Sequence, residues 1–137
     1  RSDESMPIKL IAVLVLAGHG IGHMMAPQAA FLPPGALPRD AHGLVAGATI
    51  VSGPGRAMSL LWLLPMVGFV VASYGFWTDA AWWRPLMAIS AVVSIVAILP
   101  WWNVMPAFSY LGALGVDVLV LVALATPWGD HLIRSVR

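Results

Sequence analysis

The sequence contains no cysteine and few charged residues of either sign. Its 137 residues include 7 Lys and Arg, 6 Asp and Glu and 4 His, with a formal net charge of +1 at pH 7. Without cysteine the chain forms no disulfide, no thiolate metal site and no cysteine nucleophile. The seven basic residues are scattered and form no basic cluster, so we expect no binding to nucleic acid.

Apolar residues take the place of the missing charges. Hydrophobic residues make up 60% of the chain and charged residues 9%, and the mean hydropathy is +0.87. A soluble domain carries about a quarter charged residues, and a small globule has too little interior to bury such an apolar excess. We therefore predict an integral membrane protein embedded in the lipid bilayer. The opening "RSDES" (residues 1–5) is interpreted as the remnant of an expression tag, because Met6 begins the natural-looking "MPIKLIAVLVL".

Four apolar segments are long enough to cross a membrane. A bilayer core about 30 Å thick requires roughly 20 apolar helical residues, and the segments that meet this test are approximately 7–25, 55–77, 81–99 and 105–126. The short connections after the second and third segments make consecutive helices antiparallel neighbours. We predict an all-α fold: one domain over residues 6–137, built as an antiparallel bundle of four transmembrane helices with a long loop between helices 1 and 2.

The loop predicted at residues 26–54 is long for so small a protein, and loops of this length are often functional. Its second half contains "HGLVAGATIV", which is too apolar for a solvated linker. Two conformations stay open for this segment. It forms either a short interfacial helix capped by Asp40 or a segment folded back over the bundle like a lid.

The distribution of Lys and Arg predicts the orientation in the membrane. Most of them fall on one side of the predicted bundle: Arg1, Lys9, Arg84, Arg134 and Arg137. The other side holds only Arg39 and Arg56. Because cytoplasmic segments carry the excess of basic residues, we expect a multi-pass protein of the inner (plasma) membrane with both termini in the cytoplasm and the long loop outside.

Two histidines stand near the end of the first predicted helix, in "LAGHGIGHMM" (residues 16–25). His19 and His23 are four residues apart, so their side chains project from one helical face, roughly 5–6 Å apart at Cβ. This spacing can present two imidazoles to one metal ion, and His42 in the following loop could supply a third nitrogen. Three imidazoles with an open position suit zinc, and imidazole also suits copper, iron and nickel.

A divalent transition metal bound by His19, His23 and His42 is thus one interpretation of these residues. The alternative is that both rings lie near the headgroups and hydrogen-bond to neighbouring helices or water. Haem is a less favoured cofactor, because two rings on one helix cannot hold opposite faces of a haem. The second axial ligand would then be His42 or His131.

Asp117 lies near the middle of the fourth predicted helix, in "GALGVDVLVL". An ionised group at this depth is costly, so it usually faces the bundle interior and finds a partner. At 1.5 Å per residue it lies about 18 Å below the outer start of its helix, at a depth similar to that of His19. We predict an Asp117–His19 pair, which would orient the imidazole or bind a proton. The alternative is a protonated carboxyl group bonded to Ser90 or Ser94.

Arg56 and three glycines complete the candidate residues. Arg56, at the outer end of the second helix, could hold an anionic headgroup or ligand phosphate, although an interfacial arginine that snorkels to the headgroups is the favoured interpretation. Gly18 and Gly22 have the small-xxx-small spacing that lets helices approach closely in lipid, with Gly20 between them. They predict a packing face, for a homo-oligomer or a larger membrane complex, or they leave room for a ligand beside the histidines.

Four short motifs are distributed along the predicted helices. The first helix carries "HGIGH" from His19, the second begins with "GRAMSLLWLL" from Gly55, the third begins near Trp82 and Trp83, and a Trp102-Asn103 turn follows it. In these motifs the chain resembles a group of small bacterial four-helix membrane proteins whose first helix bears an HG-x-x-H motif. The resemblance covers most of the chain and implies a fold but no activity. The longer first loop and Asp117, where a neutral amide is expected, depart from the group.

Three kinds of function stay open on this evidence. The first is binding of a ligand or metal in an outer-leaflet pocket formed by His19, His23, Asp117 and the loop around His42. The second is a structural or accessory subunit of a membrane complex, whose histidines only satisfy hydrogen bonds. The third is a membrane enzyme whose His/Asp couple transfers a proton on a lipophilic substrate. The sequence does not decide whether the protein is an enzyme.

Overall fold

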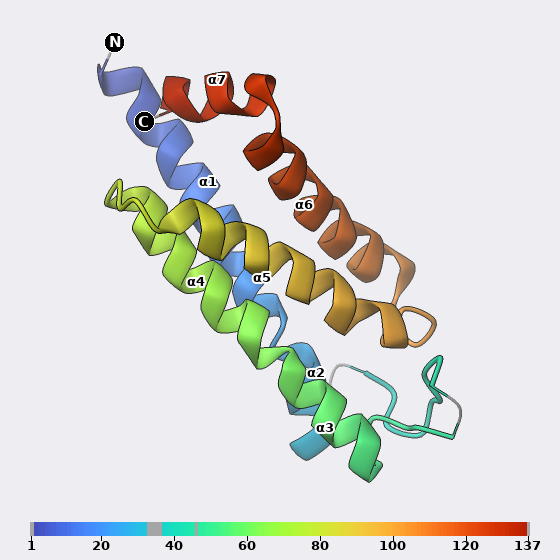
Figure 1. Cartoon of the computed structure of the whole chain (residues 1–137). Helices are drawn as coiled ribbons and strands as arrows, with labels where there is room; N and C mark the ends of the chain where they lie inside the picture. Colours follow the sequence, from blue (N-terminus) through green and yellow to red (C-terminus); the bar gives the residue numbers. More distant parts are fainter. Residues whose placement is uncertain (1, 33–36, 46, 137) are drawn as a thin grey trace.

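The computed structural model describes residues 2–32, 37–45 and 47–136, and the regular secondary structure within these residues is helical (Figure 1). No β-strand occurs among them, and β-pairing is limited to an isolated bridge between His42 and Thr49. The helical elements are α1 (Ser2–Gly22), α2 (Met25–Phe31), α3 (Gly53–Leu61), α4 (Leu63–Trp77), α5 (Trp83–Ile98), the 3-10 turn η1 (Leu99–Trp101), α6 (Ala107–Ala125) and α7 (Pro127–Val136).

Four helical segments are long and apolar enough to cross a membrane, as the sequence predicts. They are Met6–Phe31, Gly53–Trp77, Trp83–Trp101 and Ala107–Ala125. Figure 1 shows their helices side by side: α1 packs against α4, α4 against α5, and α5 against α6. The helices α1 and α6 contact each other little, so the packing leaves a seam between them.

The first segment is longer than predicted and is interrupted by a turn. The amides of His23 and Met24 donate to the carbonyls of Gly20 and Ile21, both at 3.0 Å, which are i to i−3 bonds that end the α-helical pattern. The chain then resumes as α2, which buries Ala26, Ala29 and Ala30. The prediction of a loop from residue 26 is therefore wrong over α2. Among the described residues the non-helical stretch begins at Leu32 and ends at Ser52.

The second segment is also interrupted, at Trp62 between α3 and α4. The cause is Pro65, which has no amide to donate to the carbonyl of Leu61 and whose ring disfavours continued α-helix there. Ser52 begins the segment by accepting a hydrogen bond from the amide of Gly55. The indole of Trp62 turns into the interior, where Nε1 donates to the Ala97 carbonyl at 2.9 Å. The interruption thus places a large ring next to the end of α1.

The close contact between α1 and α4 is made at Gly20. A Cβ at Gly20 would lie 2.8 Å from the Phe69 Cβ and 3.0 Å from the Met66 carbonyl oxygen, whereas a Cβ at Gly18 or Gly22 would meet nothing within 4 Å. Gly18 and Gly22 therefore make no close helix contact within the described chain, and the packing face predicted there for an oligomer or a membrane complex stays a prediction. The glycine between them permits the approach, and the other two face outward.

The apolar loop segment folds back onto the end of the helices. The Leu44 amide donates to the Pro100 carbonyl at 2.8 Å, and Asn103 Nδ2 donates to the His42 carbonyl at 3.0 Å. Side chains of this segment are buried at Leu37, Ala48 and Ile50. The interfacial helix capped by Asp40 is therefore wrong, and the folded-back segment is confirmed for residues 37–45 and 47–52.

The opposite end of the molecule gathers the charged residues predicted to share one side. Lys9 of α1 pairs with Asp79 at 3.2 Å, and Arg84 of α5 pairs with Asp130 of α7. The helix α7 lies near the beginning of α1 (Figure 1). Arg1 and Arg137 lie outside the described residues. The sequence-based prediction missed α7, a short amphipathic helix that follows the fourth predicted transmembrane segment.

Candidate functional site

The predicted pair between the first and last apolar helices is present. His19 Nε2 of α1 lies 2.9 Å from Asp117 Oδ1 of α6. The two side chains are 8% and 0% exposed. Because an ionised carboxylate in an apolar interior needs a partner, this contact accounts for Asp117 within the apolar span. The same contact links α1 to α6 across the seam between the two helices.

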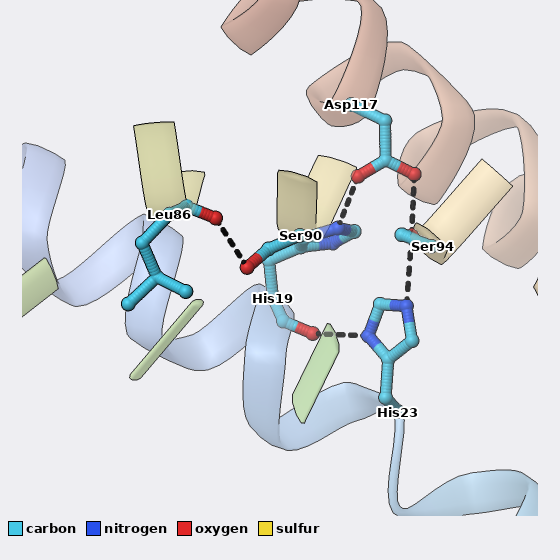
Figure 2. Close-up of polar contacts among 6 residues, drawn as sticks. All are labelled: His19, His23, Leu86, Ser90, Ser94 and Asp117. Atoms are coloured by element: carbon cyan, nitrogen blue, oxygen red, sulfur yellow. Dashed lines mark hydrogen bonds and ion pairs between the residues drawn. The ribbon is translucent and has the colours of Figure 1, made fainter. Parts of the chain in front are cut away.

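Ser94 of α5 supplies the second contact to the carboxyl group. Its Oγ donates to Asp117 Oδ2 at 2.5 Å, and Ser94 is itself fully buried. Sequence alone gave Ser90 and Ser94 as equal candidates for this role. Ser90 donates instead to the Leu86 carbonyl of its own helix at 2.7 Å (Figure 2). Its side chain lies against Gly68 of α4.

His23 extends the network from Ser94 back to α1. Its Nε2 lies 2.8 Å from Ser94 Oγ, and its Nδ1 lies 3.0 Å from the carbonyl oxygen of His19 (Figure 2). A carbonyl oxygen only accepts, so Nδ1 of His23 carries a proton and donates. The His19 carbonyl is free for this bond because the His23 amide bonds to Gly20 instead. The turn at the end of α1 therefore creates one of the contacts of the site.

Aromatic rings hold the two imidazoles in place. The rings of His19 and His23 lie nearly perpendicular, at 89° with centroids 5.0 Å apart. The Phe69 ring is 4.7 Å from that of His19, and the Trp62 ring is 5.5 Å from that of His23. These contacts leave the imidazoles little freedom to turn away from Asp117 and Ser94.

A pocket of about 390 Å³ opens beside this network, between α1 and α6. His19 and His23 form part of its surface, and the rest is mostly apolar. The other lining residues are Val15, Gly22, Met25, Trp62, Ile98, Met105, Ser109, Gly112, Ala113 and Val116. A second, wholly apolar cavity of about 200 Å³ lies on the other side of the His19–Asp117 pair, where Leu16, Val120 and Leu132 are among its lining residues.

The remaining candidate residues do not join the network. His42 is exposed in the folded-back loop, His131 is exposed on α7, and the Arg56 guanidinium lies 5.7 Å from the Phe31 ring. Over the described ranges, no group of three His, Cys, Asp or Glu side chains could hold a metal ion. The predicted sets of His19, His23 and His42 for a metal, and of a helix-1 histidine with His42 or His131 for haem, are not assembled.

The network leaves one imidazole nitrogen free for chemistry with a ligand. With Nε2 of His19 donating to the carboxylate of Asp117, the tautomer places the lone pair on Nδ1. No protein group in the part of the chain described here bonds to this Nδ1. In this tautomer His19 is an oriented hydrogen-bond acceptor, and the residue lines the mostly apolar pocket together with His23 and Ser109.

Comparisons with known proteins add no assignment to this geometry. No protein-family model, no curated protein and no solved structure matches the chain. The likeness of its short motifs to small four-helix membrane proteins therefore stays a prediction. Function has to be argued from the contacts of the site.

Proposed function

We propose that the protein binds a lipophilic molecule in the pocket between α1 and α6 and anchors its polar head at His19. The observation that carries this proposal is the buried His19–Asp117 pair, of which His19 lines a mostly apolar pocket. A pocket of about 390 Å³ falls within the range of roughly 300–1,000 Å³ usual for small-molecule sites, which combine apolar surface with a few placed polar groups.

The proposal includes the membrane setting. The four apolar segments form an antiparallel bundle in the inner membrane of a bacterium, as in the small four-helix proteins that the motifs resemble. The charged groups around Lys9, Arg84 and Asp130 lie at one end and support a shared cytoplasmic side for both termini. The pocket beside His23 lies toward the other end, close to the folded-back loop, and so in the outer half of the membrane.

The chemistry of the pocket selects the kind of ligand. Its apolar side chains require a largely hydrocarbon or aromatic body. The free Nδ1 of His19 requires a head that donates a hydrogen bond, such as a hydroxyl, a phenol or an amide. Asp117 keeps the imidazole of His19 in the accepting tautomer. Ser94 contacts Asp117, and His23 contacts Ser94 in turn. A ligand without a donor would leave the His19 nitrogen unpaired and bind more weakly.

Access to the pocket is from the side, through the bilayer. In an 18-residue apolar stretch of each span that contains α1 or α6, only 11% and 6% of the residues, respectively, are buried within the protein. The seam between these helices therefore faces lipid, and a lipophilic molecule can enter without leaving the membrane. Both a membrane lipid and a freely diffusing amphiphile have the required chemistry.

A photoreactive long-chain alcohol tests the proposal in lipid nanodiscs. We expect it to label residues of α1 and α6 around the pocket, as mapped by peptide mass spectrometry. Gly112→Phe places a ring in the pocket and should reduce the labelling at least tenfold. Gly115→Phe is the matched control, because a side chain there also meets nothing within 4 Å and Gly115 does not line the pocket.

Two outcomes would contradict the proposed pocket: labelling that Gly112→Phe leaves unchanged, or labelling that both substitutions reduce equally. Competition distinguishes the sources of the ligand. If ordinary phospholipid in excess removes the labelling, the occupant is a membrane lipid. If it does not, solvent extraction of the purified protein and mass spectrometry should recover a different amphiphile.

The exposed surface of α6 favours one further candidate, an accessory subunit of a membrane complex. Most of the apolar surface of α6 has no protein cover, and Gly112 and Gly115 leave room for a neighbouring helix. Crosslinking from α6 in native membranes should then capture one defined partner or a second copy. Capture of lipid alone would contradict this candidate.

A further inference from the structure

The four contacts of the buried network impose a proton count. The Ser94 hydroxyl has one proton, yet Ser94 Oγ lies within hydrogen-bond distance of both Asp117 Oδ2 (2.5 Å) and His23 Nε2 (2.8 Å). The Nδ1 proton of His23 is already committed to the His19 carbonyl. Each of the two contacts at Ser94 needs a proton of its own.

One arrangement that satisfies every contact is charged. His23 is then an imidazolium, whose Nε2–H donates to Ser94 Oγ while its Nδ1–H donates to His19. The Ser94 hydroxyl donates to an ionised Asp117, and a separation of 2.5 Å is usual for an O–H donor on a carboxylate. The negative charge of Asp117 balances the positive charge of His23.

A second arrangement satisfies the same contacts without any charge. Asp117 is then a carboxylic acid that donates from Oδ2 to Ser94 Oγ, and the Ser94 hydroxyl donates to the lone pair on His23 Nε2. Asp117 Oδ1 still accepts from His19 in both arrangements. The neutral arrangement avoids the free-energy cost of placing charges in an apolar interior. The charged arrangement gains the attraction between the imidazolium and the carboxylate.

Ionised Asp117 beside neutral His23 satisfies only part of the network. The single Ser94 proton then serves either the carboxylate or the imidazole, and the other contact becomes a close approach of two lone pairs. In a buried site such an unmade hydrogen bond is destabilising, because the group has lost its water without gaining a partner. The network therefore holds one proton more than ionised Asp117 and neutral His23 would carry.

We propose that Ser94 relays this proton between His23 and Asp117, so that the three residues form a proton-binding site inside the membrane. In the transfer, the Nε2–H bond of His23 breaks as an O–H bond forms on Ser94. The original Ser94 O–H bond breaks as an O–H bond forms on Asp117 Oδ2. Imidazolium and carboxylate become imidazole and carboxylic acid, and the net charge of the three groups stays at zero.

Among the described residues, His19 is the one competing partner for the proton near the site. His19 of α1 and the hydroxyl of Ser94 of α5 contact Asp117, and His23, which follows α1, contacts Ser94. On the side of α4, the Phe69 and Trp62 rings contact the imidazoles without being titratable. The relay depends on these protein contacts alone and needs no ligand in the pocket.

The experiment counts the shared proton in nanodiscs near neutral pH. Nitrogen-15 NMR gives the fraction of His23 that is imidazolium, and infrared absorption gives the fraction of Asp117 that is carboxylic acid, assigned by its loss in Asp117→Asn. We expect the two fractions to add up to about one in the wild type. Ser94→Ala should lower the sum at least fivefold. Ser94→Thr, which keeps a hydroxyl, and Ser90→Ala should preserve it.

A wild-type sum near zero overturns the proposal, whether or not any variant folds. A sum that Ser94→Ala leaves unchanged overturns it as well, because the proton would then be held without the relay. Both measurements use the protein without added ligand. Failure of the relay is therefore distinguishable from failure of the proposed pocket, which the photolabelling tests separately.

Discussion

At the scale of single residues, Asp117 organises the site. Its two carboxyl oxygens contact different helices, His19 on α1 and Ser94 on α5. The pairing with His19 could be predicted because a buried acid needs a partner and the two residues share a depth. The choice of Ser94 over Ser90 could not, since both serines lie on α5 one turn apart. The two serines are distinguished only in the folded structure, where Ser90 packs against Gly68 and Ser94 contacts Asp117.

The buried hydroxyl of Ser94 should matter more for stability than that of Ser90. Ser94→Ala leaves the Oδ2 atom of Asp117 and the Nε2 atom of His23 without a partner, at a cost of about 1–3 kcal/mol in the free energy of unfolding. Ser90→Ala removes one bond within α5 and should cost less than about 1 kcal/mol. Reversible unfolding in detergent micelles measures both. Equal losses for the two variants would show that Ser94 is an ordinary packing serine.

At the scale of helices, the interruptions of the apolar segments build the site. The turn after α1 frees the His19 carbonyl for His23, and the turn at Trp62 brings an indole beside His23. The apolar length of these segments could be read from the sequence, since it follows from composition. The α1 interruption could not, because glycines permit a turn without requiring one. Pro65 is a sequence signal for an interruption of the second segment. It does not predict that the indole of Trp62 turns toward His23.

The glycines of α1 give a prediction at this scale. Gly20→Ala puts a Cβ 2.8 Å from that of Phe69, so α1 and α4 must separate at a cost of about 1–3 kcal/mol. Gly18→Ala meets open space and should leave stability unchanged or raise it by up to about 1 kcal/mol through helix propensity. Unfolding of the two variants under identical conditions checks the order. If Gly18→Ala were more destabilising than Gly20→Ala, the close contact between α1 and α4 would not be made at Gly20.

At the scale of the whole molecule, the two ends differ in chemistry. One end holds the ion pairs Lys9–Asp79 and Arg84–Asp130, and the other is covered by the folded-back apolar loop. The distribution of basic residues predicted which segments share an end. It did not predict α7, because a ten-residue amphipathic helix gains most of its stability from the surface on which it packs. The sequence likewise did not decide between the two conformations of the loop, because the hydrogen bonds that hold the loop in place join residues far apart in the sequence.

The Arg84–Asp130 pair predicts how the docking of α7 depends on pH. The hydrogen bond from Arg84, together with the charges of Arg84 and Arg134, holds the pKa of the Asp130 carboxyl below its ordinary value, against the opposing effect of partial burial. Asp130 therefore binds a proton more weakly when α7 is docked than when it is released. The stabilisation is complete above the ordinary pKa of an aspartate and is lost as the pH falls through the lowered pKa.

Hydrogen–deuterium exchange of the α7 amides measures this docking. After correction for the intrinsic pH dependence of exchange, protection of α7 should fall in acid in the wild type. Asp130→Asn should show weaker protection that no longer changes over the same range. Because the Asp130 side chain is 39% exposed, salt should also weaken the wild-type protection. Protection in acid equal to that at neutral pH would exclude Asp130 as the group that holds α7.

The central claim is that His19 accepts a hydrogen bond from a lipophilic ligand in the pocket between α1 and α6. The most direct test is the nitrogen-15 chemical shift of His19 Nδ1, recorded in nanodiscs during a titration with a long-chain alcohol. We predict an unprotonated Nδ1 whose shift moves and saturates in the wild type and stays constant in Gly112→Phe. A wild-type shift that does not respond to the alcohol, or an equal response in Gly112→Phe, would contradict the claim.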